Sequence, residues 1–320
     1  MYTNDNINFD LDCQLDEKRV TYSKGQKIEI NPWETKKCKN EKLSASYKRL
    51  KMYSKASRVA QCSSYLEFRR YVEDNSLKLQ LANFCKVRLC PMCSWRRSLK
   101  VYGQMTKVLS QIGPEYDFRF LTLTIKNCYG KDLVATLDEL YSALDRFFKL
   151  KVIKNTFTGW FRALEVTYNP RTGQFHPHFH IVLCSKSLYY KKHYMKQDDF
   201  VQLWKQSLRV DYTPIVDIRR FNGKKGVVEA TKYTVKDNDY ILESEALTDK
   251  MVGILDGALA NRRLIAYGGL LKDIHKKLNL GDAIDGDLLN IDGEEKNSGE
   301  YIIEKFGWHV GLKNYYKIIS

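Results

Sequence analysis

Three histidines occupy alternate positions in the segment His176-Pro-His178-Phe-His180, near the middle of the chain. Successive side chains of a β-strand point to opposite faces, so a strand over this segment would place all three imidazoles on one face. Neutral imidazole is a common ligand of divalent metal ions. His178 and His180 are therefore predicted to bind a metal. The alternative is a strand that carries its histidines without a metal, because short motifs often match by chance.

The third ligand is predicted on the preceding strand. Residues 169–173 read Asn-Pro-Arg-Thr-Gly, a sequence typical of turns, and a hairpin centred near Arg171 would set Glu165 opposite or diagonal to His178. Glu165 is the candidate, and His176 is its rival. Two imidazoles and a carboxylate leave coordination positions open for water and phosphate oxygens. This donor set suits Mn²⁺ or Mg²⁺ acting on a phosphodiester.

A nucleophile and a proton acceptor are predicted further along the chain. Glu229 and Tyr233 are four residues apart, as are Lys232 and Lys236, and residues four apart share one face of a helix. A tyrosine oxygen can attack a phosphodiester and become covalently attached, while a carboxylate one turn away can activate water or a second hydroxyl. Alone the motif is weak, because the chain has 21 tyrosines and most of them must have structural roles.

Four of the eight cysteines lie in one short segment. The tight Cys90-Pro-Met-Cys93 turn can present two thiolates to one ion, and Cys85 and Cys62 would complete a tetrahedral structural Zn²⁺ site. Cys38 is the rival for the fourth place. The alternative without metal is a cluster of small buried thiols.

The composition favours a soluble, cytoplasmic protein with an anionic partner and no membrane partner. Hydrophobic residues make up 43% of the 320 residues, and the chain shows neither an apolar run of about 18 residues nor an apolar signal segment. The net charge of +15 favours nucleic acid. Arg96, Arg97 and Lys100 open a predicted helix after the cysteines. They are candidate phosphate contacts, although a basic run on a helix is often a solvated face.

Hydrophobic periodicity predicts an α+β fold. Strands are expected over residues 117–126, 160–168, 174–184 and 215–221, and helices over residues 133–148 and 197–208. This β-α-β-β-α-β order is typical of a ferredoxin-like or RRM-like antiparallel sheet backed by helices.

Four consecutive regions are expected along the chain. They are a basic N-terminal region that is flexible in this interpretation (1–55), a zinc-binding cysteine segment with its helix (56–113), the β-α-β-β-α-β core (114–240) and a helical C-terminal extension (241–320).

Together the motifs resemble the replication initiators of rolling-circle plasmids from Gram-positive bacteria, the branch of the HUH endonuclease superfamily with a single catalytic tyrosine. The resemblance runs from about Cys62 to Tyr240 and implies an HUH endonuclease core. It is carried by the segment Phe-Cys-Lys-Val-Arg-Leu-Cys-Pro-Met-Cys-Ser-Trp-Arg-Arg (84–97), the strand Phe-Leu-Thr-Leu-Thr (120–124), the histidine motif (176–180) and Glu-Ala-Thr-Lys-Tyr (229–233).

The resemblance implies a role for each motif. His178 and His180 would bind the metal, and Tyr233 would nick one strand at the plasmid double-strand origin and form a 5′-phosphotyrosine. Glu229 would assist the terminating hydrolysis, and Lys232 and Lys236 would lie beside the phosphates. A host DNA polymerase would extend the free 3′ end.

Further expectations concern partners and alternatives. No Gly-rich Lys-Ser/Thr phosphate loop occurs in the sequence, so unwinding should depend on a host helicase. A homodimer on the DNA is compatible with the sequence. Two other classes fit less well. An HUH transposase or relaxase would share the chemistry, but such transposases lack the long cysteine segment. A zinc-stabilised DNA-binding regulator would bind without cleaving.

Overall fold

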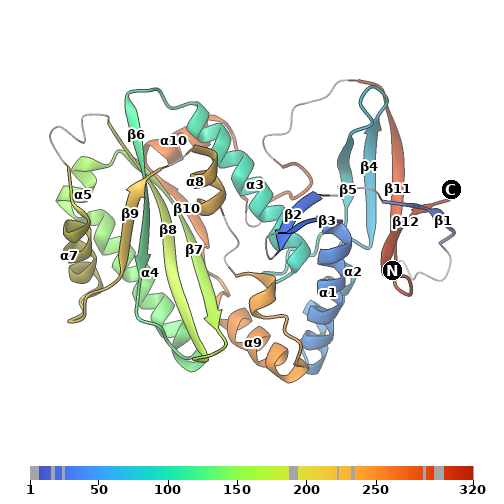
Figure 1. Ribbon diagram of the computed structural model, residues 1–320, viewed down its shortest axis with the longest axis horizontal. Coiled ribbons are helices and arrows are strands. Elements are labelled where there is room, and N and C mark those ends of the chain that lie inside the picture. Colours follow the sequence, from blue (N-terminus) through green and yellow to red (C-terminus); the bar gives the residue numbers. More distant parts are fainter. Residues whose placement is uncertain are drawn as a thin grey trace. The chain divides into compact units, whose positions relative to one another are not determined.

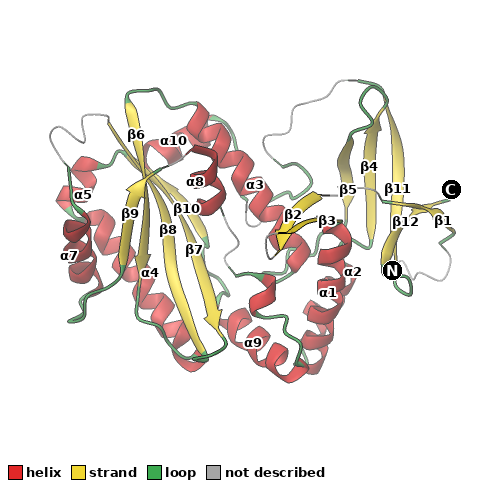
Figure 2. Ribbon diagram, viewed as in Figure 1, coloured by secondary structure: helices red, strands yellow, loops and turns green. Residues whose placement is uncertain are grey.

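The computed structural model describes residues 7–15, 19–23, 26–186, 194–221, 223–231, 235–283, 286–291 and 299–319. In this part of the chain the fold is mixed α+β, with two five-stranded antiparallel sheets and the two-stranded sheet of β2 (Arg19–Ser23) and β3 (Gln26–Ile30) (Figure 1, Figure 2). Two compact units are distinguished by their internal contacts. The terminal unit comprises residues 1–97, 240–252 and 287–320, and the central unit comprises residues 98–239 and 253–286.

The sheet of the central unit has the strand order β10-β7-β8-β6-β9. Along the chain its elements follow the predicted β-α-β-β-α-β order: β6 (Tyr116–Thr124), α4 (Leu133–Lys149), β7 (Gly159–Asn169), β8 (Gln174–Lys186), α7 (Gln197–Leu208) and β9 (Val216–Arg220). The short helix α5 (Lys151–Thr156) precedes β7, and β10 (Ile265–Gly268) adds an edge strand next to it.

The predicted hairpin of β7 and β8 is confirmed. Gly173 has a φ of +68°, a left-handed conformation that glycine adopts at little cost. Asn169 stabilises the turn, because its carbonyl accepts a hydrogen bond from Gly173 N at 2.9 Å and its side-chain oxygen accepts one from Arg171 N at 2.9 Å. The turn residues therefore act as their types predict.

Helices cover both faces of this sheet. On one face, Tyr141 of α4 packs edge-on against Phe179, with ring centroids 5.2 Å apart. On the other face, a buried apolar cluster joins Phe120, Phe161 and Val182 to side chains from α3 (Pro91–Ser110), α8 (Gly223–Ala230) and α10 (Gly269–Lys277). Because β8 side chains alternate, this second face is also the face of His178 and His180.

The sheet of the terminal unit has the order β1-β12-β11-β4-β5 and draws its strands from both ends of the chain. Its strands are β1 (Phe9–Gln14), β4 (Tyr65–Tyr71), β5 (Leu77–Ala82), β11 (Tyr301–His309) and β12 (Asn314–Ile318). Helix α1 (Pro32–Arg49) is capped by Asn31, whose side-chain oxygen accepts from Trp33 N at 3.0 Å. Trp33 packs on Phe68 of β4 with centroids 5.7 Å apart, so α1 covers one face of this sheet.

Two regions differ from the sequence-based expectation. Residues 1–55, for which no fold was predicted, contain β1, β2, β3 and α1. Residues 241–320, predicted as helical, contain β10, β11 and β12 besides α9 (Glu245–Ala258) and α10. Strand β11 pairs with β4, which lies more than 200 residues earlier, and local periodicity cannot reveal so distant a partner. Each unit is thus assembled from separate segments, whereas the four expected regions are consecutive.

Helix α2 (Tyr53–Gln61) follows α1 in the terminal unit. Within the residues that the structure describes, no helix combines the length and the apolar character needed to cross a bilayer.

Candidate functional site

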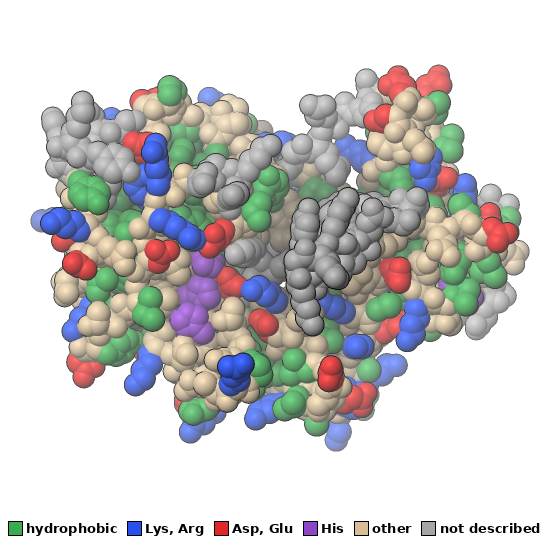
Figure 3. Space-filling view, viewed as in Figure 1, with side chains coloured by type: hydrophobic (Ala, Val, Ile, Leu, Met, Phe, Trp, Pro, Cys, Tyr) green, Lys and Arg blue, Asp and Glu red, His purple; other side chains and the backbone are tan. Residues whose placement is uncertain are grey.

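The register of β7 and β8 brings a carboxylate to the histidines. Glu165 lies directly opposite His178, and Ala163 lies opposite His180. The Oε2 atom of Glu165 is 2.8 Å from His180 Nε2 and 3.4 Å from His178 Nε2, and the two Nε2 atoms are 3.2 Å apart. All three side chains are buried, with exposed fractions of 6 to 8%. Figure 3 shows histidine side chains gathered on one face of the molecule.

This spacing fits one metal ion. Donor atoms at about 2.1 Å from a shared ion lie about 3.0 to 3.4 Å apart, depending on whether the geometry is octahedral or tetrahedral. The measured separations of 2.8 to 3.4 Å cover that interval. Glu165, His178 and His180 therefore form a donor group that can hold a divalent cation.

Neighbouring groups orient both imidazoles. His178 Nδ1 lies 3.1 Å from the carbonyl oxygen of His176, an acceptor that orients the ring with Nε2 towards Glu165 and His180. His180 Nδ1 lies 3.3 Å from the hydroxyl of Thr122. Burial opposes the ionisation of Glu165, but its hydrogen bonds and charge interactions with the two histidines outweigh burial and lower its pKa. The carboxylate is thus held in the ionised form that a cation requires.

His176, the rival third ligand, is not a member of this donor group. Its Nδ1 is 2.6 Å from the side-chain oxygen of Asn127, and its ring centroid is 4.9 Å from that of His178. Burial and the charge of His178 lower the pKa of His176. In the described part of the chain, the residue that completes the donor group is Glu165.

Glu229 lies on the same face of the sheet as the donor group. It is on α8, which joins the apolar cluster through Val227 and Ala230. Arg219 of β9 holds the carboxylate, with Nη2 2.6 Å from Glu229 Oε1. The Arg219 guanidinium lies 5.0 Å from the centroid of the Phe120 ring, which is 5.3 Å from the ring of His180.

Lys232 and Tyr233 lie outside the described residues. Residues on either side of them in the sequence are described. The Thr231 hydroxyl donates to Val227 O at 2.8 Å, one turn earlier on α8, and Lys236 Nζ is 3.8 Å from Glu165 Oε1. Lys236 is exposed.

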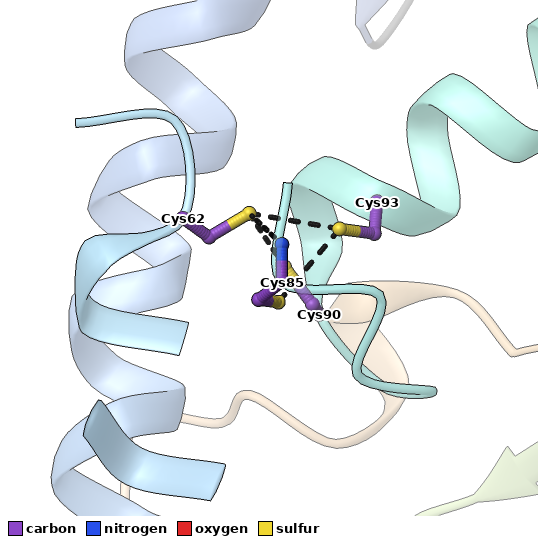
Figure 4. Close-up of side chains that lie close together, drawn as sticks. All are labelled: Cys62, Cys85, Cys90 and Cys93. Atoms are coloured by element: carbon purple, nitrogen blue, oxygen red, sulfur yellow. Dashed lines mark hydrogen bonds between the residues drawn. The ribbon is translucent and has the colours of Figure 1, made fainter. Parts of the chain in front are cut away.

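The four cysteines form a second candidate metal centre (Figure 4). Sulfur to sulfur distances are 3.6 Å for Cys62–Cys93, 3.6 Å for Cys62–Cys90 and 3.7 Å for Cys85–Cys93. Four thiolates at about 2.3 Å from a zinc ion lie about 3.8 Å apart, so the group fits a tetrahedral site. Backbone N–H groups of Cys85 and Lys86 point at Cys62 Sγ and Cys93 Sγ at 3.4 and 3.3 Å, which stabilises thiolates.

The sequence left the fourth cysteine undecided and gave no sign that Lys37 is buried beside the group. Cys38, the rival for the fourth place, is outside the group, which Cys62 completes. The Lys37 ammonium is 1% exposed and donates to the carbonyls of Ala60 and Cys62 at 2.6 and 2.7 Å. Lys37 stands near Lys36 and Lys39 in the sequence, and its burial distinguishes it from these half-buried neighbours.

The three basic residues at the start of α3 are buried, with exposed fractions of 3% for Arg96, 9% for Arg97 and 5% for Lys100. Arg96 donates to the carbonyls of Leu288 and Leu289, and Arg97 donates to those of Lys86 and Val87. In this structure the two arginines hold loops of the terminal unit. Because all three basic side chains are buried, the structure does not support their predicted contact with phosphates.

Arg219 was also missed by the sequence analysis. Strand alternation places it on one face with Asp217, but its role depends on the pairing of β9 with β6, which sets Arg219 opposite Phe120.

Comparison with known proteins gives the family. The family model described as "Replication protein" matches residues 76–316. A "Protein rep" of Bacillus amyloliquefaciens is 42% identical over 285 residues, which cover 82% of this chain and 84% of the relative. A "Protein rep" of Streptococcus pneumoniae is 36% identical over 312 residues, covering 93% and 95%. No solved structure matches. The chain therefore belongs to the Rep family of replication proteins, the plasmid replication initiators of Gram-positive bacteria.

Proposed function

We propose that this protein is a metal-dependent, origin-specific endonuclease and strand transferase of the HUH superfamily, which starts rolling-circle replication by nicking one strand of the plasmid origin. The observation that carries the proposal is the buried donor group of Glu165, His178 and His180, which shares a sheet face with Glu229. The strand order β9-β6-β8-β7 supports it, because it is the order of a ferredoxin-like sheet, the core expected for this superfamily.

Glu165, His178 and His180 would hold a Mn²⁺ or Mg²⁺ ion. When bound, such an ion would polarise the scissile phosphate. The low pKa of Glu165 keeps its carboxylate available for the ion. The Lys236 ammonium, 3.8 Å from that carboxylate, adds positive charge where a phosphate would lie, and Lys232 is proposed to do the same.

Tyr233 is the proposed nucleophile. Its oxygen would form the bond to phosphorus while the bond to the 3′ oxygen breaks, and the phenolic proton would be lost as the 3′ oxygen takes one up. The product is a 5′-phosphotyrosine and a free 3′ hydroxyl for a host polymerase. In the sequence Tyr233 stands three residues before Lys236, whose Nζ lies 3.8 Å from Glu165 Oε1.

Glu229 is proposed to act at termination, when it would accept a proton from water or from a DNA hydroxyl. Its contact with Arg219 supports this role, because the guanidinium limits where the carboxylate can point.

The remaining proposals concern metal and partners. The cysteine group would hold a structural Zn²⁺ ion. Origin DNA is the proposed substrate, in keeping with the basic composition of the chain. A host helicase would unwind the DNA, and the proposed state of the protein on DNA is a homodimer. The cytoplasm is the proposed location.

The test is incubation of the purified protein with supercoiled DNA carrying the cognate origin, with Mn²⁺ or Mg²⁺, followed by denaturing gels and mass spectrometry of the adduct. Nicking with a 5′ adduct on Tyr233 is expected. Tyr233→Phe should abolish it, because phenylalanine has no attacking oxygen, whereas Tyr129→Phe, at a tyrosine that is 53% exposed, should nick normally.

Nicking that persists in Tyr233→Phe would remove the tyrosine from its role. DNA binding without a nick under either metal would instead favour a non-catalytic regulator.

A further inference from the structure

We propose that the sheet of the terminal unit carries a separate surface that binds single-stranded DNA by base stacking. The proposal rests on the proposed function only in taking DNA as the partner, because none of its residues belongs to the metal-binding or cleavage site. We call this surface the aromatic face. It consists of the outward side chains of β4, β5 and β11: Tyr65, Glu67, Arg69, Tyr71, Lys78, Leu81, Tyr301, Ile303 and Lys305.

Strand pairing places these side chains on one face. Residues directly opposite one another in an antiparallel pair share a face. The register of β11 and β4 sets Tyr301 opposite Tyr71, and it likewise sets Ile303 opposite Arg69 and Lys305 opposite Glu67. The register of β4 and β5 adds Lys78 opposite Arg69 and Leu81 opposite Glu67.

The alternate residues of the same strands form the inner face. Phe68 and Phe306 are 1% exposed, and Phe68 packs on Trp33 of α1. The aromatic face therefore points away from α1. On this face Tyr301 is 44% exposed and Ile303 is 41% exposed, whereas Tyr71 is only 3% exposed and packs beside Tyr301.

The aromatic side chains offer a stacking platform. The Tyr301 ring meets Tyr71 edge-on with centroids 5.9 Å apart, and the Arg69 guanidinium lies 4.6 Å from the centroid of the Tyr301 ring. Nucleobases stack on exposed aromatic rings and on guanidinium planes with little regard to sequence.

Charge favours a nucleic acid as the occupant. The face carries Arg69, Lys78 and Lys305 against one carboxylate, that of Glu67, which accepts a hydrogen bond from the Tyr65 hydroxyl. In a nucleic acid the cations would contact the phosphates, and the aromatic rings would contact the bases. In a duplex the base faces are covered by stacking, so the aromatic groups favour single-stranded DNA, which nicking and unwinding of an origin would supply.

The test measures binding of the full-length protein to a fluorescent oligonucleotide of about 20 thymidines by anisotropy, without added divalent cation. Tyr301→Ala should weaken binding by about tenfold, the effect of losing one stacked base, and Lys305→Glu should also weaken it severalfold. The matched controls are Tyr53→Ala, at a tyrosine of α2 that is 66% exposed, and Lys48→Glu, at an exposed lysine of α1. Both controls should bind like the wild type.

Photo-crosslinking of an oligonucleotide containing 5-iododeoxyuridine, read by mass spectrometry, should mark the peptide containing Tyr301. Wild-type affinity in Tyr301→Ala and Lys305→Glu, or crosslinks confined to the central unit, would overturn the proposal. Weaker binding of a matched duplex but not of the single strand would overturn it in favour of a duplex-binding surface.

The two proposals fail separately. Loss of origin nicking in samples that keep Tyr301-dependent binding would remove only the cleavage function. Normal nicking with unaltered oligonucleotide binding by the variants would remove only the aromatic face.

Discussion

At the scale of single residues, the metal proposal depends most on Glu165. A carboxylate that is 6% exposed is costly to bury unless it is paired. Two imidazoles within 3.4 Å supply that pairing in the structure described here, and a cation would replace part of it. The residue is therefore constrained by both stability and ligation, and the two contributions can be measured apart.

Glu165→Gln should weaken Mn²⁺ binding by more than about a hundredfold, because losing groups that only orient a ligand already costs roughly 10- to 100-fold. Isothermal titration calorimetry measures the affinity. Glu139→Gln, at an exposed glutamate of α4, is the matched control. Equal affinity in Glu165→Gln and the wild type would show that the carboxylate is not a ligand.

The same variant has a predicted pH signature in the metal-free protein. The pKa of Glu165 is lowered in the folded state, so its contribution to stability is present above the unfolded value of about 4.3 and is lost as pH falls towards the folded value. The difference in unfolding free energy between wild type and Glu165→Gln, measured with urea, should therefore shrink below about pH 4.

At the scale of elements, the cysteine group joins three segments of the terminal unit. Cys62 caps the C-terminus of α2, Cys85 lies in the loop after β5, and Cys90 and Cys93 flank the start of α3. A bound zinc ion would fix these elements relative to one another within the terminal unit.

Cys62→Ser should therefore abolish equimolar zinc binding and lower the melting temperature, since binding to a structural site contributes directly to folding. Metal content by mass spectrometry and thermal unfolding measure the two effects. Cys184→Ser is the control, because Cys184 is buried on β8 and burial raises the pKa of its thiol to about 11. If Cys62→Ser kept one zinc ion and its melting temperature, the assignment would have to be given up.

At the scale of the whole molecule, the terminal unit is closed by contacts between the two ends of the chain. Trp308 of β11 is 2% exposed, and its indole donates to Glu41 of α1 at 2.8 Å. Tyr315 of β12 donates to the carbonyl of Ser63 at 2.7 Å.

Trp308→Ala should cost about 3 to 5 kcal/mol of unfolding free energy, the usual range for a large aromatic removed from a core. Leu312→Ala, at a side chain that is 52% exposed, should change it by less than about 0.5 kcal/mol. Urea denaturation measures both. A cost below 1 kcal/mol for Trp308→Ala would show that β11 contributes little to the stability of the terminal unit.

Local patterns predicted the elements of the central sheet and its β7–β8 hairpin, because strand alternation, helical periodicity and the turn residues 169–173 are properties of neighbouring residues. The hairpin in turn predicted that Glu165 would face His178, since register follows from the turn. The cysteine spacing likewise predicted a thiol group of Cys62, Cys85, Cys90 and Cys93, with Cys38 left as the rival for the fourth place.

The tertiary structure decided what local patterns leave open. It put Cys62 into the thiol group and Cys38 outside it, and it set Arg219 against Glu229. It also buried Lys37 and two of the candidate phosphate contacts, Arg96 and Arg97. The sheet of the terminal unit, with its aromatic face, pairs β4 with β11 across more than 200 residues. Such contacts depend on which distant surfaces bury each other best, and no local periodicity records that choice.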